Sequence, residues 1–103
     1  MSWATTYIND LKNGKTVSFR PHGGSMAGRI ESGDLCVVEP IGKRILKVGD
    51  VVLCNVNGSQ YLHLIKGING QQYQIGNNRG RINGWIEAGN IYGVCVKIEG
   101  IAV

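Results

Sequence analysis

The stretch VVLCNVNGSQYLHLIKGINGQQYQI, residues 51–75, decides the fold class of this 103-residue chain. Three runs with strand-forming composition, 51–56, 60–68 and 71–75, are separated by the dipeptides Asn57-Gly58 and Asn69-Gly70. Asn-Gly is the preferred dipeptide of two-residue hairpin turns, because both residues tolerate positive φ. The spacing therefore predicts an antiparallel meander whose middle strand carries His63.

Further strand-like runs lie on both sides of this meander. They cover residues 16–19, 35–39 and 91–98 and are bounded by Gly, Asn or Asp. Gly33-Asp34 and Gly49-Asp50 each stand immediately before a strand, where glycine permits positive φ and aspartate bonds nearby amides. The chain is therefore predicted to be mainly β and mostly antiparallel.

The N-terminal residues show helical rather than strand periodicity. Residues 2–13 carry apolar side chains at helical spacing, namely Trp3, Tyr7, Ile8 and Leu11. Ser2 is a candidate N-cap and Gly14 a candidate C-terminal stop. We expect one domain, residues 1–103, with a single amphipathic helix at 2–13 and a β core at about 16–98.

Composition agrees with a small β domain. The chain has 16 glycines but only two prolines, and average glycine usage is about 7%, so tight turns between short strands are expected. A chain of this length buries about 60–70% of its unfolded surface, which permits a modest core without disulfides.

The cysteines and the charges exclude several classes of protein. Cys36, Cys54 and Cys95 lie inside apolar runs, and their spacing fits neither a zinc site nor a disulfide framework. We expect buried free thiols, no metal and no cofactor. No apolar stretch reaches 18 residues and no secretion signal opens the chain, which favours a soluble, cytoplasmic protein without a membrane anchor.

The net charge of +4 does not indicate nucleic-acid binding, because the basic residues are spread along the chain. Only Lys43, Arg44 and Lys47, and the pair Arg79 and Arg81, lie close together in sequence. We interpret Arg79 and Arg81 as exposed charges, with carboxylate or phosphate binding as the alternative.

The run RPHGGSM, residues 20–26, places a serine in a glycine-rich turn. Together with His63 on a later strand, Ser25 forms the minimum set for nucleophilic catalysis, because a neutral imidazole near pH 7 can accept the hydroxyl proton. The Gly24 or Ser25 N–H is then a candidate oxyanion donor. His22, in the same turn as Ser25, is interpreted as a surface or substrate-contact residue.

The order of motifs resembles the signal peptidase and LexA-like superfamily of serine peptidases over residues 17–98. The matching segments are Gly24-Ser25-Met26, Gly33-Asp34, Gly49-Asp50, a polar residue on the following strand, Gly76-Asn77-Asn78-Arg79, Asn83-Gly84-Trp85 and Ile91-Tyr92-Gly93-Val94. The resemblance implies a small coiled, barrel-like antiparallel β fold. It also implies a peptide substrate lying extended against an exposed strand edge.

Carried over by position, the resemblance implies that Ser25 is the nucleophile and that His63 is the general base. Bacterial members have lysine as the base, whereas archaeal and endoplasmic-reticulum members have histidine. Gly24, Met26 and Asn78 would line the site. Lys66 is an alternative base, but it lies three residues beyond His63 and would point to the opposite face of a flat strand.

The chain departs from the pattern at several positions. Met26 is not followed by the usual proline, and Gly23 replaces a serine that donates to the oxyanion in many members. Asn77 and Asn83 stand where an orienting carboxylate would be expected, so the sequence predicts a Ser-His dyad. The predicted function is a small serine peptidase-like hydrolase. The alternative is an inactive binding module of the same fold, for a partner protein or a small anionic ligand.

Overall fold

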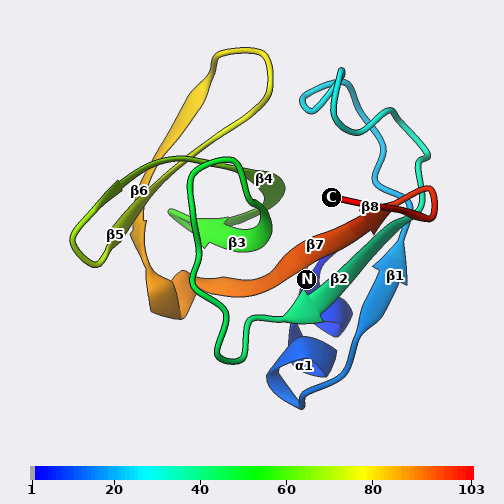
Figure 1. Ribbon diagram of the computed structural model, residues 1–103, viewed down its shortest axis with the longest axis horizontal. Helices are drawn as coiled ribbons and strands as arrows, with labels where there is room; N and C mark the ends of the chain where they lie inside the picture. Colours follow the sequence, from blue (N-terminus) through cyan, green and yellow to red (C-terminus); the bar gives the residue numbers. More distant parts are fainter. Residues whose placement is uncertain (1) are drawn as a thin grey trace.

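The predicted meander is present in the computed structural model, which describes residues 2–103. In those residues the chain forms one α-helix, eight strands and one 3-10 turn (Figure 1). Their bounds are α1 Thr5–Lys12, β1 Val17–Phe19, β2 Cys36–Pro40, β3 Val51–Val56, β4 Ser59–Asn69, β5 Gln72–Gly76, β6 Ile82–Glu87, η1 Ala88–Asn90, β7 Ile91–Ile98 and β8 Ile101–Ala102. The predicted mainly-β class with an N-terminal helix is confirmed.

All strand pairs are antiparallel, and the strand order is β1-β2-β7-β3-β4-β5-β6, with β8 paired to β7. His63 lies on β4 between β3 and β5, as predicted. Within residues 2–103 no pairing joins β1 to β6, so the sheet is not closed into a ring of hydrogen-bonded strands. Helix α1 packs on the β1-β2-β7 part of the sheet (Figure 1).

The two hairpins differ in how closely they follow the prediction. Between β3 and β4, Asn57 and Gly58 have φ of 51° and 89°, the positive values that this turn requires. Between β4 and β5 the turn lies one residue later than predicted, because Asn69 pairs with Gln72 and remains in the ladder. Gly70, with φ of 61°, then takes the first central position of the turn.

Strands β6 and β8 were not predicted. In β6, Gly84 interrupts the apolar alternation of Ile82–Glu87, and its φ of 149° is one that side-chain-bearing residues rarely adopt. β8 is only two residues long and pairs with the end of β7. β6 therefore lacks an unbroken alternation of apolar residues, and β8 is shorter than the runs by which a strand is recognised in a sequence.

Helix α1 is shorter than the predicted 2–13. Ala4 is its N-cap and makes no side-chain cap bond, whereas the Ser2 Oγ accepts a hydrogen bond from the Ala4 N–H at 3.3 Å. The prediction that Ser2 is the N-cap is therefore wrong. Its hydroxyl instead supports the turn that precedes the helix. The Gly14 stop is confirmed, with φ of 79° and an N–H that donates to the Leu11 carbonyl at 3.0 Å.

The interior consists of two apolar clusters on opposite faces of β3. Val51 and Leu53 belong to the cluster under α1, and Val52 and Cys54 belong to the cluster under the β4-β5-β6 hairpins. β3 is thus buried on both faces, and all three cysteines are buried free thiols, as predicted. No helix within residues 2–103 has the length and apolar character needed to cross a membrane.

Candidate active site

Ser25 lies in the irregular segment between β1 and β2, and its backbone is fixed by hydrogen bonds on both sides. Gly23 has φ of 119° and donates its N–H to the Ser32 Oγ at 3.1 Å. The Ala27 N–H donates to the Gly24 carbonyl at 3.2 Å. These bonds define a tight turn, and the Ser25 side chain is exposed on it.

Asn78 connects this turn to the loop between β5 and β6. Its backbone N–H donates to the Ser25 carbonyl at 3.0 Å, and its Nδ2 donates to the Ala27 carbonyl at 2.8 Å. Asn78 therefore holds the Ser25 turn in place, although it is not among the residues that line the cleft with Ser25 and His63. Because its side-chain amide is bonded to Ala27, we interpret it as a positioning residue for the turn rather than as an oxyanion donor.

The other two residues expected to line the site have different environments. Met26 is 5% exposed and belongs to the core cluster under α1, where it anchors the turn and also lines the cleft beside Ser25. Gly24 is exposed. Within residues 2–103 no hydrogen bond engages the backbone N–H groups of Gly24 or Ser25, so both donors remain open to a bound ligand.

His63 makes hydrogen bonds through both ring nitrogens. Its Nε2 lies 3.2 Å from the Ser25 Oγ, and its Nδ1 lies 2.8 Å from the Asn83 Oδ1. An amide oxygen only accepts hydrogen bonds, so the Nδ1 carries the proton of the neutral ring. The Nε2 lone pair then faces the serine hydroxyl, which is the tautomer that a general base requires.

Burial keeps this imidazole neutral. His63 is only 7% exposed, and the Tyr61 ring stacks on it with centroids 4.7 Å apart. Desolvation lowers the pKa of His63 below its ordinary value of 6.5, and the hydrogen bond to Asn83 opposes part of that shift. At neutral pH the ring is therefore able to accept a proton.

Asn83 is the residue whose role the sequence did not reveal. The sequence predicted a dyad without an orienting partner, whereas the structure holds the ring in a chain of three side chains, Ser25, His63 and Asn83. Asn83 fixes the tautomer and the ring orientation, but it supplies no negative charge. The available signal was its place in the Asn83-Gly84-Trp85 segment, with a side chain that can accept a hydrogen bond.

Asn77, the other asparagine of that region, has a structural role. Its Oδ1 accepts hydrogen bonds from the N–H groups of Arg79 and Arg81, at 2.8 and 2.9 Å. Its own N–H donates to the Arg81 carbonyl at 2.9 Å. These bonds close the loop between β5 and β6 and so hold Asn78 in place against the Ser25 turn.

Asn83 is the extra residue of a bulge in β6, because Ile75 pairs with Gly84 and Gly76 pairs with Ile82. A Cβ on Gly76 would lie 2.5 Å from the Arg81 carbonyl oxygen, so glycine is required where β5 ends and β6 begins beside it. The register also shifts between Ile75 and Gly76. Bulges locally re-aim a side chain, and at this one the Asn83 side chain contacts His63.

The structure distinguishes the two candidate bases. Lys66 lies at a bulge between Ile65 and Gly67, and its side chain passes close to Gly76. Within residues 2–103 it makes no hydrogen bond to Ser25 or His63, whereas His63 lies at hydrogen-bond distance from the Ser25 Oγ.

Ser25 and His63 line one cleft of about 460 Å³. His22 is exposed and lines the same cleft. Arg79 and Arg81 are exposed, and the Arg79 Nη1 lies 3.9 Å from the point where a Cβ on Gly24 would stand. Within residues 2–103 no cluster of three His, Cys, Asp or Glu side chains is placed to hold a metal ion.

No protein-family model matches the chain, and no curated protein matches it.

Proposed function

We propose that this protein is a serine peptidase-like hydrolase, in which Ser25 is the nucleophile and His63 is the general base. The observation that carries the proposal is the 3.2 Å contact between the Ser25 Oγ and the His63 Nε2, in a ring whose Nδ1 is bonded to Asn83. A serine hydroxyl becomes a good nucleophile only when an adjacent base accepts its proton.

The reaction follows from these contacts. As the Ser25 Oγ attacks the carbonyl carbon of a bound peptide, a C–O bond forms and the hydroxyl proton moves to the His63 Nε2. The negative charge on the carbonyl oxygen is stabilised by the free N–H groups of Gly24 and Ser25. The C–N bond then breaks, and the Nε2 returns the proton to the leaving amine. Water, activated by the same nitrogen, hydrolyses the acyl-enzyme.

Asn83 makes this site slower than one with a carboxylate. An amide oxygen holds the Nδ1–H but does not offset the charge of the imidazolium that forms during attack. A histidine with an asparagine partner is found in cysteine peptidases of the papain type, so the arrangement is compatible with acyl transfer.

The order of motifs supports membership of the signal peptidase and LexA-like superfamily, with the coiled, barrel-like fold of that group. The substrate in this proposal is a peptide that lies extended beside Ser25. The protein in this proposal acts in the cytoplasm, and its reaction uses no cofactor. The uncharged Asn83 favours the second candidate function, in which the same fold binds a partner protein or a small anionic ligand without cleaving it.

A serine-directed fluorophosphonate probe with intact-mass measurement separates the two functions. We expect one adduct on the wild type and none on Ser25→Ala. His63→Ala should slow labelling by about 10²- to 10⁴-fold, the usual contribution of a general base. Lys66→Ala is the matched control and should label at close to the wild-type rate.

Absence of an adduct on the wild type, under conditions that label a known serine peptidase, would refute the hydrolase and favour the binding module. Loss of labelling in Lys66→Ala, with labelling retained in His63→Ala, would show that lysine is the base.

A further inference from the structure

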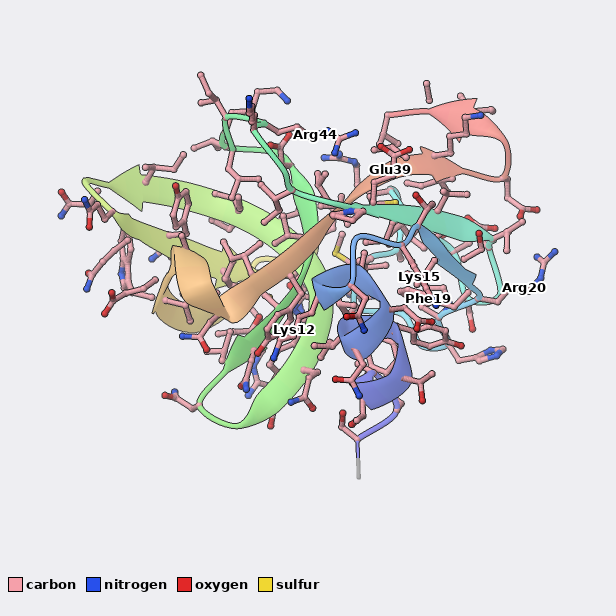
Figure 2. The ribbon with its side chains drawn as sticks, turned by 90° about the horizontal axis from the view of Figure 1, so that it is seen from below. Lys12, Lys15, Phe19, Arg20, Glu39 and Arg44 are labelled. Atoms are coloured by element: carbon pink, nitrogen blue, oxygen red, sulfur yellow. The ribbon has the colours of Figure 1, made fainter. Side chains whose placement is uncertain are left out.

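The cleft that contains Ser25 and His63 has a wall of three aromatic rings, which come from the turn before helix α1, from α1 itself and from strand β1. The rings are those of Trp3, Tyr7 and Phe19. Tyr7 stacks on Phe19 with centroids 4.6 Å apart, and Trp3 meets Phe19 edge-on at 5.5 Å. Figure 2 shows Phe19 beside α1 and Arg20 directed away from it.

This wall is already ordered and only partly covered. Phe19 is 7% exposed and supports the other two rings, whereas Trp3 is 50% exposed. Both Trp3 and Tyr7 precede residue 17, so they lie outside the span of the superfamily resemblance. They are a feature of this chain that the proposed chemistry at Ser25 does not explain.

The charges around the cleft are mostly engaged elsewhere. The Arg20 Nη1 donates to the Gly33 carbonyl at 2.9 Å and lies 3.4 Å from the Glu99 carboxylate. The Glu31 carboxylate accepts a hydrogen bond from the Gly28 N–H at 3.3 Å. The wall therefore presents aromatic carbon to a ligand, flanked by charges that already have partners.

The size of the cleft also favours a large group. Its volume of about 460 Å³ falls within the range of about 300–1,000 Å³ that is typical of ligand sites. A methyl side chain would leave the aromatic wall largely uncovered. An aromatic side chain buries about 150–250 Å² and gains from offset or edge-on packing with other rings.

We propose that the Trp3, Tyr7 and Phe19 wall is a side-chain subsite and that it selects peptides carrying a large apolar residue, aromatic above all, next to the bond held at Ser25. The inference rests on the proposed function, because it takes the ligand at Ser25 to be a peptide. The N-terminal segment that includes Trp3 and helix α1 is then a specificity element as well as a cover for the sheet.

Peptide binding to Ser25→Ala tests this inference without turnover. Two end-capped, fluorescently labelled peptides, differing only in one phenylalanine or alanine within a Gly-rich sequence, are titrated and followed by anisotropy. We expect the phenylalanine peptide to bind at least about 10-fold more tightly, because an aromatic side chain removes far more apolar surface from water than a methyl group does.

Two tryptophan variants in the Ser25→Ala background provide a matched comparison. Trp3 and Trp85 are almost equally exposed, at 50% and 47%, but Trp85 lies on β6 and does not line this cleft. Trp3→Ala should remove most of the preference for phenylalanine, whereas Trp85→Ala should keep it. Near-ultraviolet and far-ultraviolet circular dichroism of both variants reports whether the fold is retained.

Equal affinity for the two peptides, binding of neither peptide, or a preference that survives in a folded Trp3→Ala variant would overturn the subsite. These failures are distinguishable from failure of the hydrolase. A Trp3-dependent preference without a covalent adduct at Ser25 would leave the subsite standing and reject the chemistry. An adduct at Ser25 without the preference for phenylalanine would support the chemistry and reject the subsite.

Discussion

Replacing Asn83 by aspartate should turn the partner of His63 into a charged group with almost no change of shape. The Asn83 Oδ1 lies 2.8 Å from the His63 Nδ1. Asn83 is half-buried and His63 is buried. A carboxylate oxygen at that position would keep the hydrogen bond and add a negative charge beside the imidazolium.

The size of the effect follows from this contact. An opposite charge at hydrogen-bond distance typically moves a pKa by about 1–3 units, and each unit corresponds to about 1.4 kcal/mol. Asn83→Asp should therefore raise the pKa of His63 by about that amount. The same interaction stabilises the imidazolium formed during attack. Reactivity at a pH above the new pKa should rise by up to about 10-fold for each pKa unit, because 1.4 kcal/mol off the barrier is tenfold in rate.

The assay combines NMR titration with probe labelling. The chain has two histidines, so the imidazole signals of His63 and His22 can be followed separately. The His63 midpoint should move to higher pH in Asn83→Asp, and the labelling profile should move with it. Asn77→Asp is the control, because it makes the same charge change at a side chain bonded to loop amides instead of to the imidazole.

An unchanged His63 midpoint in Asn83→Asp would refute the reasoning. So would an equal shift in Asn77→Asp, because the effect would then be one of general charge rather than of the direct contact.

Three other outcomes follow from the structure. Because burial lowers the pKa of His63, the unfolded chain binds more protons than the folded protein just below pH 6.5. The free energy of unfolding should therefore be highest above that pH and fall as the pH decreases. Urea unfolding across pH 5–8 measures this, and a flat profile would contradict the burial. A thiol reagent should label the native protein slowly and label three groups after denaturation, because all three cysteines are buried. Burial also raises the pKa of Cys54 to about 12. Rapid labelling of the native protein would mean that a thiol is accessible. Gly76→Ala should destabilise the fold by about 1–3 kcal/mol, because its Cβ would meet the Arg81 carbonyl oxygen at 2.5 Å. Gly89→Ala should change stability little, because nothing lies within 4 Å of a Cβ at that position. Equal effects of the two substitutions in denaturant unfolding would refute the close approach.

Local features were the most predictable from sequence. The Asn57-Gly58 turn was placed correctly because the two residues that form it also determine its geometry. Gly14 was identified as the helix stop for the same reason. The turn after β4 was displaced by one residue, since the ladder kept Asn69 in register with Gln72, and this pairing depends on the neighbouring strand.

The site was predictable in its residues but not in its full geometry. Motif order was sufficient to pair Ser25 with His63, which the structure places at hydrogen-bond distance. The contact between His63 and Asn83 was missed because Asn83 is the extra residue of a bulge in β6, where Ile75 pairs with Gly84 and Gly76 pairs with Ile82. Sequence spacing does not reveal such a bulge.

The place of β7 in the strand order has a consequence for the time at which the site is assembled. β7 lies between β2 and β3 in the sheet. It therefore joins β1 and β2, the strands on either side of the Ser25 segment, to β3 and β4, of which β4 carries His63. As the chain is synthesised from its N-terminus, both residues emerge long before residues 91–98. Until β7 is inserted, the two halves lack the strand that aligns them. Ser25 and His63 should therefore be held together only after residues 91–98 have been made.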